Sequence, residues 1–323
     1  RAAAGQDPKT APLAGGAGEV FEKRGESAMN ARDLFAKLFV TERYFTIGIR
    51  KRQAGSILEN QRFAPEFILP VTCEKWCADP ILVEDGDKTW LFYEAVRDDH
   101  GHIEVAEVRD DCTLGEPIVV LQDACHYSYP FVFRYENDWY MIPESSASSQ
   151  VRLYRATRFP GEWEPVAVLL RERAVDTTVF AHEEQMYLLT YIPDSATERV
   201  TPKAYRLDFQ EDGPVLTAVS WDRFDGLRVR GAGPVFAEGG ALYRPAQISR
   251  EQRYGDGLVF YRIADPEGYE EMPVCEMGPE HLKLRGCYGD GLHTYCRSAR
   301  FEAIDIRTGT VDFAKPIKKI FRK

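Results

Sequence analysis

ADPILVEDGDKTWLFYEA (residues 78–95) and SYPFVFRYENDWYMIPES (residues 128–145) share one pattern: a short strand, a tight turn and an aromatic-rich strand. The pattern returns in VDTTVFAHEEQMYLLTY (175–191), AGPVFAEGGALYRPAQ (232–247) and, more weakly, LHTYCRSARFEAIDI (292–306). Its equivalent first positions are separated by 50, 47, 57 and 60 residues, and they hold Asp79, Tyr129, Asp176, Gly233 and His293. A period near 50 residues with about four short strands per unit is typical of propeller blades. The sequence therefore predicts an all-β fold, a five-bladed β-propeller.

The remaining strands of each blade follow from the same pattern of β-branched and aromatic runs between turns. In the first blade, we expect them at residues 102–108 and 117–122, and in the second at 151–157 and 163–170. The fifth unit runs out of chain before it has four strands, so we expect the strand around Ile47 to close the ring against it. A β-sandwich with a similar number of strands is the alternative, but it gives no reason for five matched units.

The N-terminal part differs from the repeats. Residues 1–28 are rich in Ala, Gly, Pro and charge, and they read as a linker or disordered segment. Residues 29–45 contain a predicted short amphipathic helix, and the propeller is expected over residues 46–323. The apolar side chains of that helix fall on one face: Leu34, Phe35, Leu38 and Phe39.

Composition limits the partners. The chain of 323 residues is 44% hydrophobic and carries a formal net charge of −10, which disfavours nucleic acid as a partner. No apolar run approaches the length of about 18 residues that a membrane-spanning helix needs. The seven cysteines are odd in number and scattered, so we expect reduced thiols and a cytoplasmic location.

Cofactor and metal motifs are not found. Cys73 and Cys77 lack a second ligand pair, and His100 with His102, in the turn after Glu94, offers no complete set for zinc. Nucleotide-binding and nucleophile-elbow motifs are also missing. We therefore expect no cofactor and no catalytic metal.

Polar residues recur where the inner strands begin. Since every innermost strand of a propeller starts near the central axis, residues that are distant in sequence converge there. The set comprises Asp79, Tyr129, Asp176, Gly233 and His293 at the first positions, Glu94, Glu144, Arg244 and Gln247 at the ends of the second strands, and His126 and Arg230 just ahead of their strands. Buried acids are costly unless they are used, and glycosidic-bond cleavage needs one protonated and one ionised carboxyl.

The start of the first unit, Asp79-Pro80, resembles the five-bladed propellers of glycoside hydrolase families 43 and 32. A closer resemblance covers most of the chain from Ile47 onward. Its segments are CADPILVEDGDKTWLFYEA, HYSYPFVFRYENDWYMIPESS, VRLYRATRFP, VDTTVF, ALYRPAQ and GLHTYC, among which IPESS and LYRPAQ are the most specific. They are similar to the N-terminal domain of the glucosamine inositolphosphorylceramide transferase family and its bacterial relatives. That resemblance implies a covalently linked transferase domain, including formyltransferase-like ones.

The family 43 pattern is incomplete here. That family carries an Asp at the second blade, where this chain has Tyr129, and a Glu at the third, where it has Asp176. We expect Glu144 to supply the missing acid.

Two functions remain open at this point. The first is glycosidase-type cleavage or transfer at an acid-lined central pocket, with Asp79 as nucleophile or base, Glu144 as general acid and Asp176 as orienter or pKa modulator. The second is a non-catalytic domain that recognises a glycan or acceptor for a linked glycosyl- or formyltransferase. A pure interaction scaffold leaves the inner acids unexplained. Substrate contacts are expected from Glu94, His126, Tyr129, Arg230, Arg244, Gln247 and His293, and the expected partner is a carbohydrate or glycoconjugate.

Overall fold

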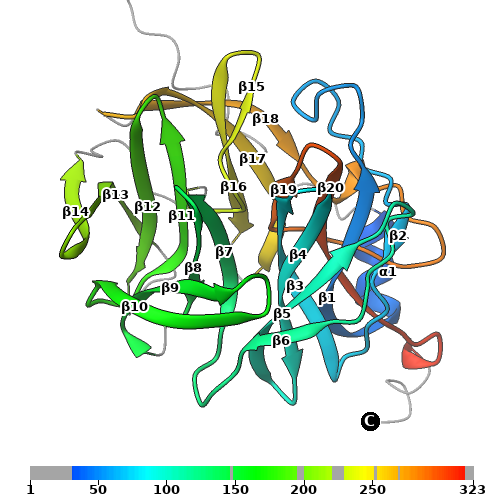
Figure 1. Cartoon of the computed structure of the whole chain (residues 1–323). Helices are drawn as coiled ribbons and strands as arrows, with labels where there is room; N and C mark the ends of the chain where they lie inside the picture. The colour runs from blue at the N-terminus through cyan, green and yellow to red at the C-terminus, as the bar shows by residue number, and fades with distance from the viewer. Residues whose placement is uncertain are drawn as a thin grey trace, which may run out of the picture.

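A computed structural model describes residues 31–145, 148–194, 200–219, 229–250, 253–267 and 270–316. The predicted linker, residues 1–28, lies outside these ranges. Within them, five four-stranded antiparallel sheets are arranged around one axis (Figure 1). The predicted five-bladed propeller is confirmed.

Each of the first four blades is built from four consecutive strands, with the first strand innermost. Blade 1 contains β3 (Lys75–Asp85), β4 (Lys88–Arg97), β5 (His100–Val108) and β6 (Ile118–Leu121). Blade 2 contains β7 (Ser128–Tyr135), β8 (Asp138–Glu144), β9 (Val151–Arg158) and β10 (Glu162–Leu170). Blade 3 contains β11 (Val175–His182), β12 (Gln185–Pro193), β13 (Val200–Gln210) and β14 (Gly213–Val219). Blade 4 contains β15 (Phe236–Glu238), β16 (Ala241–Arg250), β17 (Arg253–Asp265) and β18 (Glu270–Met277).

Blade 5 joins the two ends of the chain. Its inner strands are β19 (Tyr295–Arg297) and β20 (Phe301–Val311), and its outer strands are β1 (Val40–Lys51) and β2 (Phe67–Ile68). β1 pairs with β20, with Ile47 opposite Asp305, so the first and last strands of the ring lie side by side (Figure 1). The predicted closure by the strand around Ile47 is confirmed.

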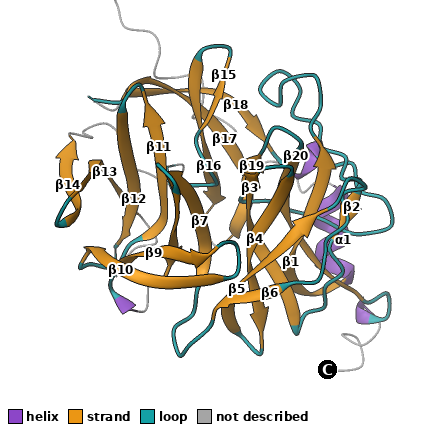
Figure 2. Cartoon of the chain, in the orientation of Figure 1, coloured by secondary structure: helices purple, strands orange, loops and turns teal. Residues whose placement is uncertain are grey.

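The N-terminal helix is shorter than expected. α1 spans Ala31–Phe39, and β1 begins at once with Val40, whereas the sequence interpretation extended the helix region to residue 45. The reason is tertiary, because residues 40–51 gain β20 as a pairing partner. Figure 2 shows that strands dominate the molecule and that α1 lies outside the ring, beside blade 5. No described helix is long and apolar enough to cross a membrane.

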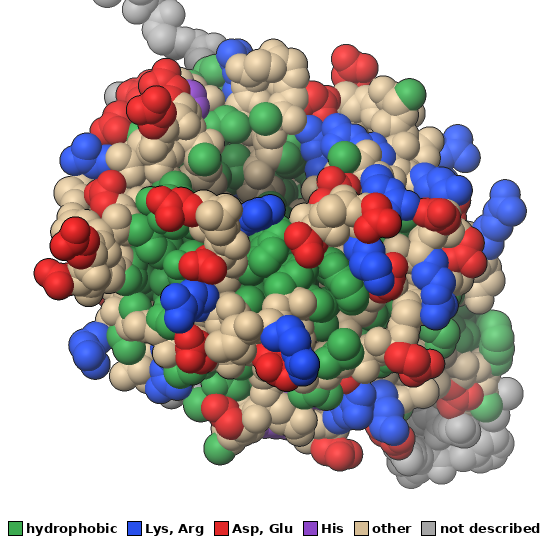
Figure 3. All heavy atoms as spheres, in the orientation of Figure 1, with side chains coloured by type: hydrophobic (Ala, Val, Ile, Leu, Met, Phe, Trp, Pro, Cys, Tyr) green, Lys and Arg blue, Asp and Glu red, His purple; other side chains and the backbone are tan. Residues whose placement is uncertain are grey.

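Apolar side chains fill the spaces between neighbouring blades. Phe92, Val105 and Met141 belong to one such cluster between blades 1 and 2. Trp90, Trp139 and Trp163 pack against the same cluster, so all three tryptophans serve core packing. Figure 3 shows one face of the molecule, where hydrophobic side chains gather at the centre and charged side chains surround them. Inter-blade packing of this kind fixes where each inner strand begins.

Candidate functional site

Three inner strands begin with the same backbone feature. Asp79, Tyr129 and Asp176 have positive φ values of 53°, 41° and 50°. At each of these positions the pairing register with the next strand shifts by one residue, which is a β-bulge. Gly233 takes the equivalent position in blade 4 with φ 123°. Positive φ is uncommon for residues other than glycine, and its repetition at equivalent positions marks this end of the ring as a candidate site.

Asp79 in blade 1 meets the start of blade 5. The hydroxyl of Thr294 donates to Oδ1 of Asp79 at 2.9 Å, and Nε2 of His293 lies 3.2 Å from the same oxygen. The amide of Tyr129 donates to Oδ2 at 3.1 Å. Asp305 lies on the other side of the imidazole, with Oδ2 2.9 Å from Nδ1 of His293. One histidine therefore lies between two buried carboxylates.

The charges of this group support one another. Burial lowers the pKa of His293, but Asp305 and Asp79 outweigh burial and raise that pKa to about 10. Burial raises the pKa of Asp79, yet His293 and the Thr294 hydroxyl bring the net pKa below its usual value. At neutral pH we expect an imidazolium beside an ionised Asp79.

Blades 2 and 3 contribute a second group around Arg230. Its guanidinium forms a forked ion pair with Asp176, and its Nη2 lies 3.7 Å from Oε2 of Glu144. The amide of Asp176 also donates to Oε2 of Glu144 at 3.1 Å. In the described part of the chain, Oε1 of Glu144 has no hydrogen-bond partner.

Glu144 differs from Asp79 in its protonation. Burial and the nearby charge of Asp176 raise the pKa of Glu144 to about 8, although Arg230 opposes the rise. The side chain keeps 11% of its surface exposed. At neutral pH we therefore expect a mostly protonated Glu144, within the electrostatic reach of an ionised Asp79. For Asp176, burial raises the pKa and Arg230 opposes that rise.

A further carboxyl, Glu94 of blade 1, contacts a histidine. Nε2 of His126 lies 2.8 Å from Oε1 of Glu94, and the amide of Gly101 donates to Nδ1 of His126 at 3.0 Å. The hydrogen bond to Glu94 raises the pKa of His126. Burial raises the pKa of Glu94. A side chain at position 101 would collide with this pair, because an added Cβ lies 2.6 Å from Nε2 of His126 and 2.8 Å from Oε1 of Glu94.

We call these residues the central polar cluster. Its members act on one another's pKa values, so the structure brings them together; all of them except Asp305 were expected from the sequence. They are Asp79, Glu94, His126, Glu144, Asp176, Arg230, His293 and Asp305.

Tyr129 lies beneath the cluster rather than in it. Its ring is fully buried, and its hydroxyl bonds to Thr178 Oγ1 at 2.9 Å and accepts from the amide of Gly233 at 2.9 Å. The side chain thus links blades 2, 3 and 4 across the axis. The expectation that Tyr129 contacts substrate is not supported, because a side chain at this position fills the interior.

Arg244 and Gln247 also differ from expectation. The guanidinium of Arg244 is buried and donates two hydrogen bonds to the carboxylate of Glu271. It also donates to Tyr191 Oη at 3.0 Å. Gln247 is fully buried and donates to the carbonyl of Gly231 at 2.8 Å. Both residues support the wall around Asp176 and Arg230, so their positions do not favour the predicted substrate contacts.

Aromatic side chains border the central polar cluster, and the repeat pattern did not reveal them. The ring of Phe45 lies 4.5 Å from that of His293, and the ring of Tyr254 lies 4.8 Å from it. Arg230 lies over Tyr254 at 5.3 Å, and Tyr254 is 43% exposed. Trp76 extends the group, 6.3 Å from Phe45. The only sequence signal is that these aromatic residues precede or flank the repeated units.

One group of described residues has ligand atoms close enough together to hold a metal ion. Asp79, His293 and Asp305 offer ligand atoms within 4.8 Å of one another. The two carboxylates raise the pKa of His293 to about 10, so a metal ion bound here would have to displace the proton of the imidazole. The imidazolium itself supplies positive charge between the two carboxylates. His100 and His102 both lie in β5, which starts two residues before the strand predicted from residue 102, and buried His102 lies 3.0 Å from Glu104.

Comparison with known proteins identifies the family of this chain. Residues 70–293 match the family described as "Glucosamine inositolphosphorylceramide transferase 1, N-terminal". The chain belongs to this family. The Oryza sativa subsp. indica glucosamine inositolphosphorylceramide transferase 1 is 34% identical over 218 residues, which are 64% of this chain and 29% of that protein. The Arabidopsis thaliana relative of the same name is 34% identical over 209 residues, 61% of this chain and 27% of that protein. The chain spans less than a third of the length of these curated relatives.

Solved structures support the fold of this family member. The GH43 endo-arabinanase from Bacillus licheniformis superposes with a TM-score of 0.50 at 12% identity, covering 68% of this chain and 84% of that one. The GH43_1 enzyme from Xanthomonas citri has a TM-score of 0.50 at 11% identity, covering 75% and 93%. At such low sequence identities, the two superpositions show only that the propeller fold is shared, as the resemblance implied.

Proposed function

We propose that this domain binds carbohydrate at the central polar cluster and acts there on a glycosidic linkage, by cleavage or transfer. The observation that carries the proposal is that one cluster holds Glu144, whose pKa is raised to about 8, and Asp79, whose pKa lies below its usual value. Glycosidic chemistry needs a protonated and an ionised carboxyl side by side. Oε1 of Glu144 makes no hydrogen bond with described residues, so this oxygen can serve a leaving group.

The proposed roles follow from the contacts. Glu144 donates the proton, and Asp79, held by His293 and Thr294, acts as base or nucleophile. Asp176 raises the pKa of Glu144, and its two hydrogen bonds with the guanidinium of Arg230 orient that side chain. Arg230, whose side chain is 28% exposed, contacts substrate hydroxyls or an acidic group.

The aromatic border supports a sugar ligand. Sugar rings present apolar faces of C–H groups, and exposed aromatic rings offer matching surfaces. Tyr254 is exposed beside Arg230 and His293, as such a platform requires. Glu94 and His126 complete the donors and acceptors on the blade 1 side.

A second candidate is a recognition domain without turnover. Its support is that the carboxylate oxygens of Asp79 and Asp176 already have protein partners. The curated relatives, more than three times the length of the aligned region, are named transferases. In this candidate, the domain presents a glycoconjugate acceptor to a linked transferase domain.

The proposal is tested by screening oligosaccharides and glycolipids for binding by calorimetry and for product release by chromatography. Tyr254→Ala is the diagnostic variant for the location of the site, with Tyr140→Ala in blade 2 as the matched control. We expect Tyr254→Ala to weaken the best ligand about tenfold, since stacked aromatic contacts contribute about 0.5–1.5 kcal/mol beyond their buried area. Equal affinity of wild type and Tyr254→Ala contradicts a site at the cluster.

A further inference from the structure

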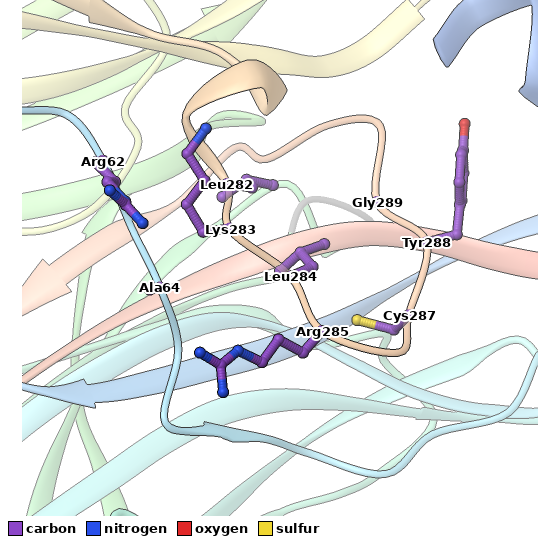
Figure 4. Close-up of a pocket in the computed structure, with 9 residues that line it drawn as sticks. All are labelled: Arg62, Ala64, Leu282, Lys283, Leu284, Arg285, Cys287, Tyr288 and Gly289. Atoms are coloured by element: carbon purple, nitrogen blue, oxygen red, sulfur yellow. The ribbon is translucent and has the colours of Figure 1, made fainter.

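One cavity is lined by residues that do not belong to the central polar cluster. Its volume is about 530 Å³, and two segments line it: residues 62–64, which precede β2, and residues 282–289, which lead from β18 to β19. Figure 4 shows Arg62 on one segment and the loop with Lys283 and Arg285 on the other. The parallel bridge between Phe63 and Leu282 holds the two segments together. The cavity is therefore part of the fold and not a gap beside one loop.

The lining of this cavity is cationic. Arg62, Lys283 and Arg285 contribute to it, and none of its nine lining residues is acidic. Neither Arg62 nor Arg285 forms an ion pair with the described residues. Among the residues that the structure describes, Lys283 donates from Nζ only to the backbone carbonyl of Glu280, at 3.1 Å. In a chain whose formal net charge is −10, three cations without a carboxylate among them form a local positive site.

Apolar groups complete the cavity. Leu284 lies on the same loop as Arg285, and its side chain is directed toward Gly289 (Figure 4). Tyr288 donates its hydroxyl to Asp290 at 2.7 Å, and its ring packs 5.7 Å from Phe35 of α1. The loop is thus fixed at its C-terminal end, which keeps Arg285 and Cys287 beside the opening.

The cavity lies near the central polar cluster. Gly289 lines the cavity and His293 is four residues later, so their Cα atoms are at most about 14 Å apart. Arg307 connects the same regions, because it contacts Asp290 at 2.7 Å and also bonds the carbonyl of Tyr254. A ligand that extends a few sugar units from the cluster reaches this distance.

We propose that this cavity binds a phosphate group carried by the ligand. A planar carboxylate is satisfied by a single guanidinium fork, whereas a phosphate presents oxygens in several directions and suits cations from two walls. Free phosphate esters and the phosphate of a lipid headgroup share this chemistry. The proposal rests on a ligand at the central polar cluster, but phosphate binding is measured without turnover and can fail separately from the acid–base roles proposed for Glu144 and Asp79.

The test uses glucose 1-phosphate and inorganic phosphate in solution, and phosphatidylcholine vesicles with and without phosphatidylinositol. Calorimetry and vesicle sedimentation measure binding for wild type, Arg62→Gln, Arg285→Gln and the double variant. Arg134→Gln, an exposed cation on β7, is the matched control. We expect each single variant to weaken phosphate binding about tenfold and the double variant more, with Arg134→Gln unchanged.

Competition between soluble glucose 1-phosphate and the vesicles distinguishes a free phosphate ester from a lipid headgroup as the ligand. Binding of glucose 1-phosphate without recruitment to phosphatidylinositol vesicles supports a free ester, and vesicle recruitment that glucose 1-phosphate displaces supports a headgroup. No saturable binding in either arm, or equal binding by wild type and the double variant, overturns the proposal. Equal loss in Arg134→Gln also overturns it, because the effect is then one of overall charge.

Two exposed thiols allow ligand binding to be measured in the wild-type protein, without any substitution. Cys287 lines the cavity, whereas Cys73 is exposed outside it. Bound glucose 1-phosphate should slow alkylation of Cys287 by iodoacetamide several-fold, measured by peptide mass spectrometry, and leave Cys73 unchanged. Equal rates at Cys287 with and without saturating ligand contradict the site.

Discussion

Nε2 of His293 lies 3.2 Å from Oδ1 of Asp79, so an ion pair joins the start of blade 5 to the start of blade 1. Asp305, from the strand that closes the ring, lies 2.9 Å from the other ring nitrogen. The same contacts that close the propeller therefore set the charge of the candidate base. Closure and chemistry depend on one histidine.

This arrangement predicts a loss of stability at alkaline pH. The pKa of His293 rises from 6.5 to about 10 on folding, so its contribution is complete below about pH 6.5 and is lost as the pH rises to 10. Denaturant titrations of wild type and His293→Gln measure the free energy of unfolding across this window. We expect the wild type to lose on the order of a few kcal/mol more than the variant. If the unfolding free energies of wild type and His293→Gln change in parallel with pH, His293 is not a buried imidazolium.

Glu144 predicts a pH effect on stability of the same sign. Its pKa is 4.5 in the unfolded chain and about 8 in the fold, so folding favours the protonated form. Its contribution is complete below about pH 4.5 and is lost as the pH rises through 8. Glu144→Gln keeps the amide contact from Asp176 without titrating, so its stability relative to wild type should rise over this range. The exposed Glu116→Gln is the control and should show no such trend.

Gly101 is predicted to be essential for the Glu94–His126 pair. Ala at position 101 should cost about 1–3 kcal/mol, as overpacking does, because its Cβ lies 2.6 Å from Nε2 of His126. Displacing Glu94 should also lower the pKa of His126, measured by NMR titration. Gly55→Ala is the matched control, since nothing lies within 4 Å of its Cβ. A Gly101→Ala variant as stable as Gly55→Ala would show that the pair is not held as described.

Tyr129 is predicted to act through its hydroxyl. Tyr129→Phe leaves the amide of Gly233 without its buried acceptor, which should cost about 1–3 kcal/mol of unfolding free energy. Thermal and urea unfolding measure the loss, and Tyr140→Phe on β8 is the control. Equal stability of the two variants contradicts a structural link across the axis.

Sequence period predicted the ring because each blade must repeat the same strands to bury its two faces. The convergence of Asp79, Glu144 and Asp176 followed from that geometry. The burial of Tyr129 did not follow, because it shares the bulge and positive φ of Asp79 and Asp176, and only its hydroxyl contacts with Thr178 and Gly233 show that its ring fills the interior. Arg244 was unpredictable for another reason, since its partner Glu271 lies on a different strand, and pairing there removes the guanidinium from the site.

Phe45, Tyr254 and Asp305 were missed because they lie outside the first positions of the repeats. Phe45 belongs to the strand that closes the ring, and Tyr254 to the start of β17. Only the register of β1 on β20 and the fold of blade 4 bring them to His293. Their spacing in sequence carries no such information.

The central claim is that Glu144 and Asp79 perform chemistry on a bound sugar, and paired measurements of turnover and affinity test it. Asp79→Asn and Glu144→Gln keep shape and hydrogen bonding but remove charge or the titrating proton. On the best ligand of the screen, we predict that turnover collapses in both variants while the calorimetric affinity stays within about tenfold of wild type. Binding of that ligand by wild type without any product release would contradict the account and leave the recognition domain as the function.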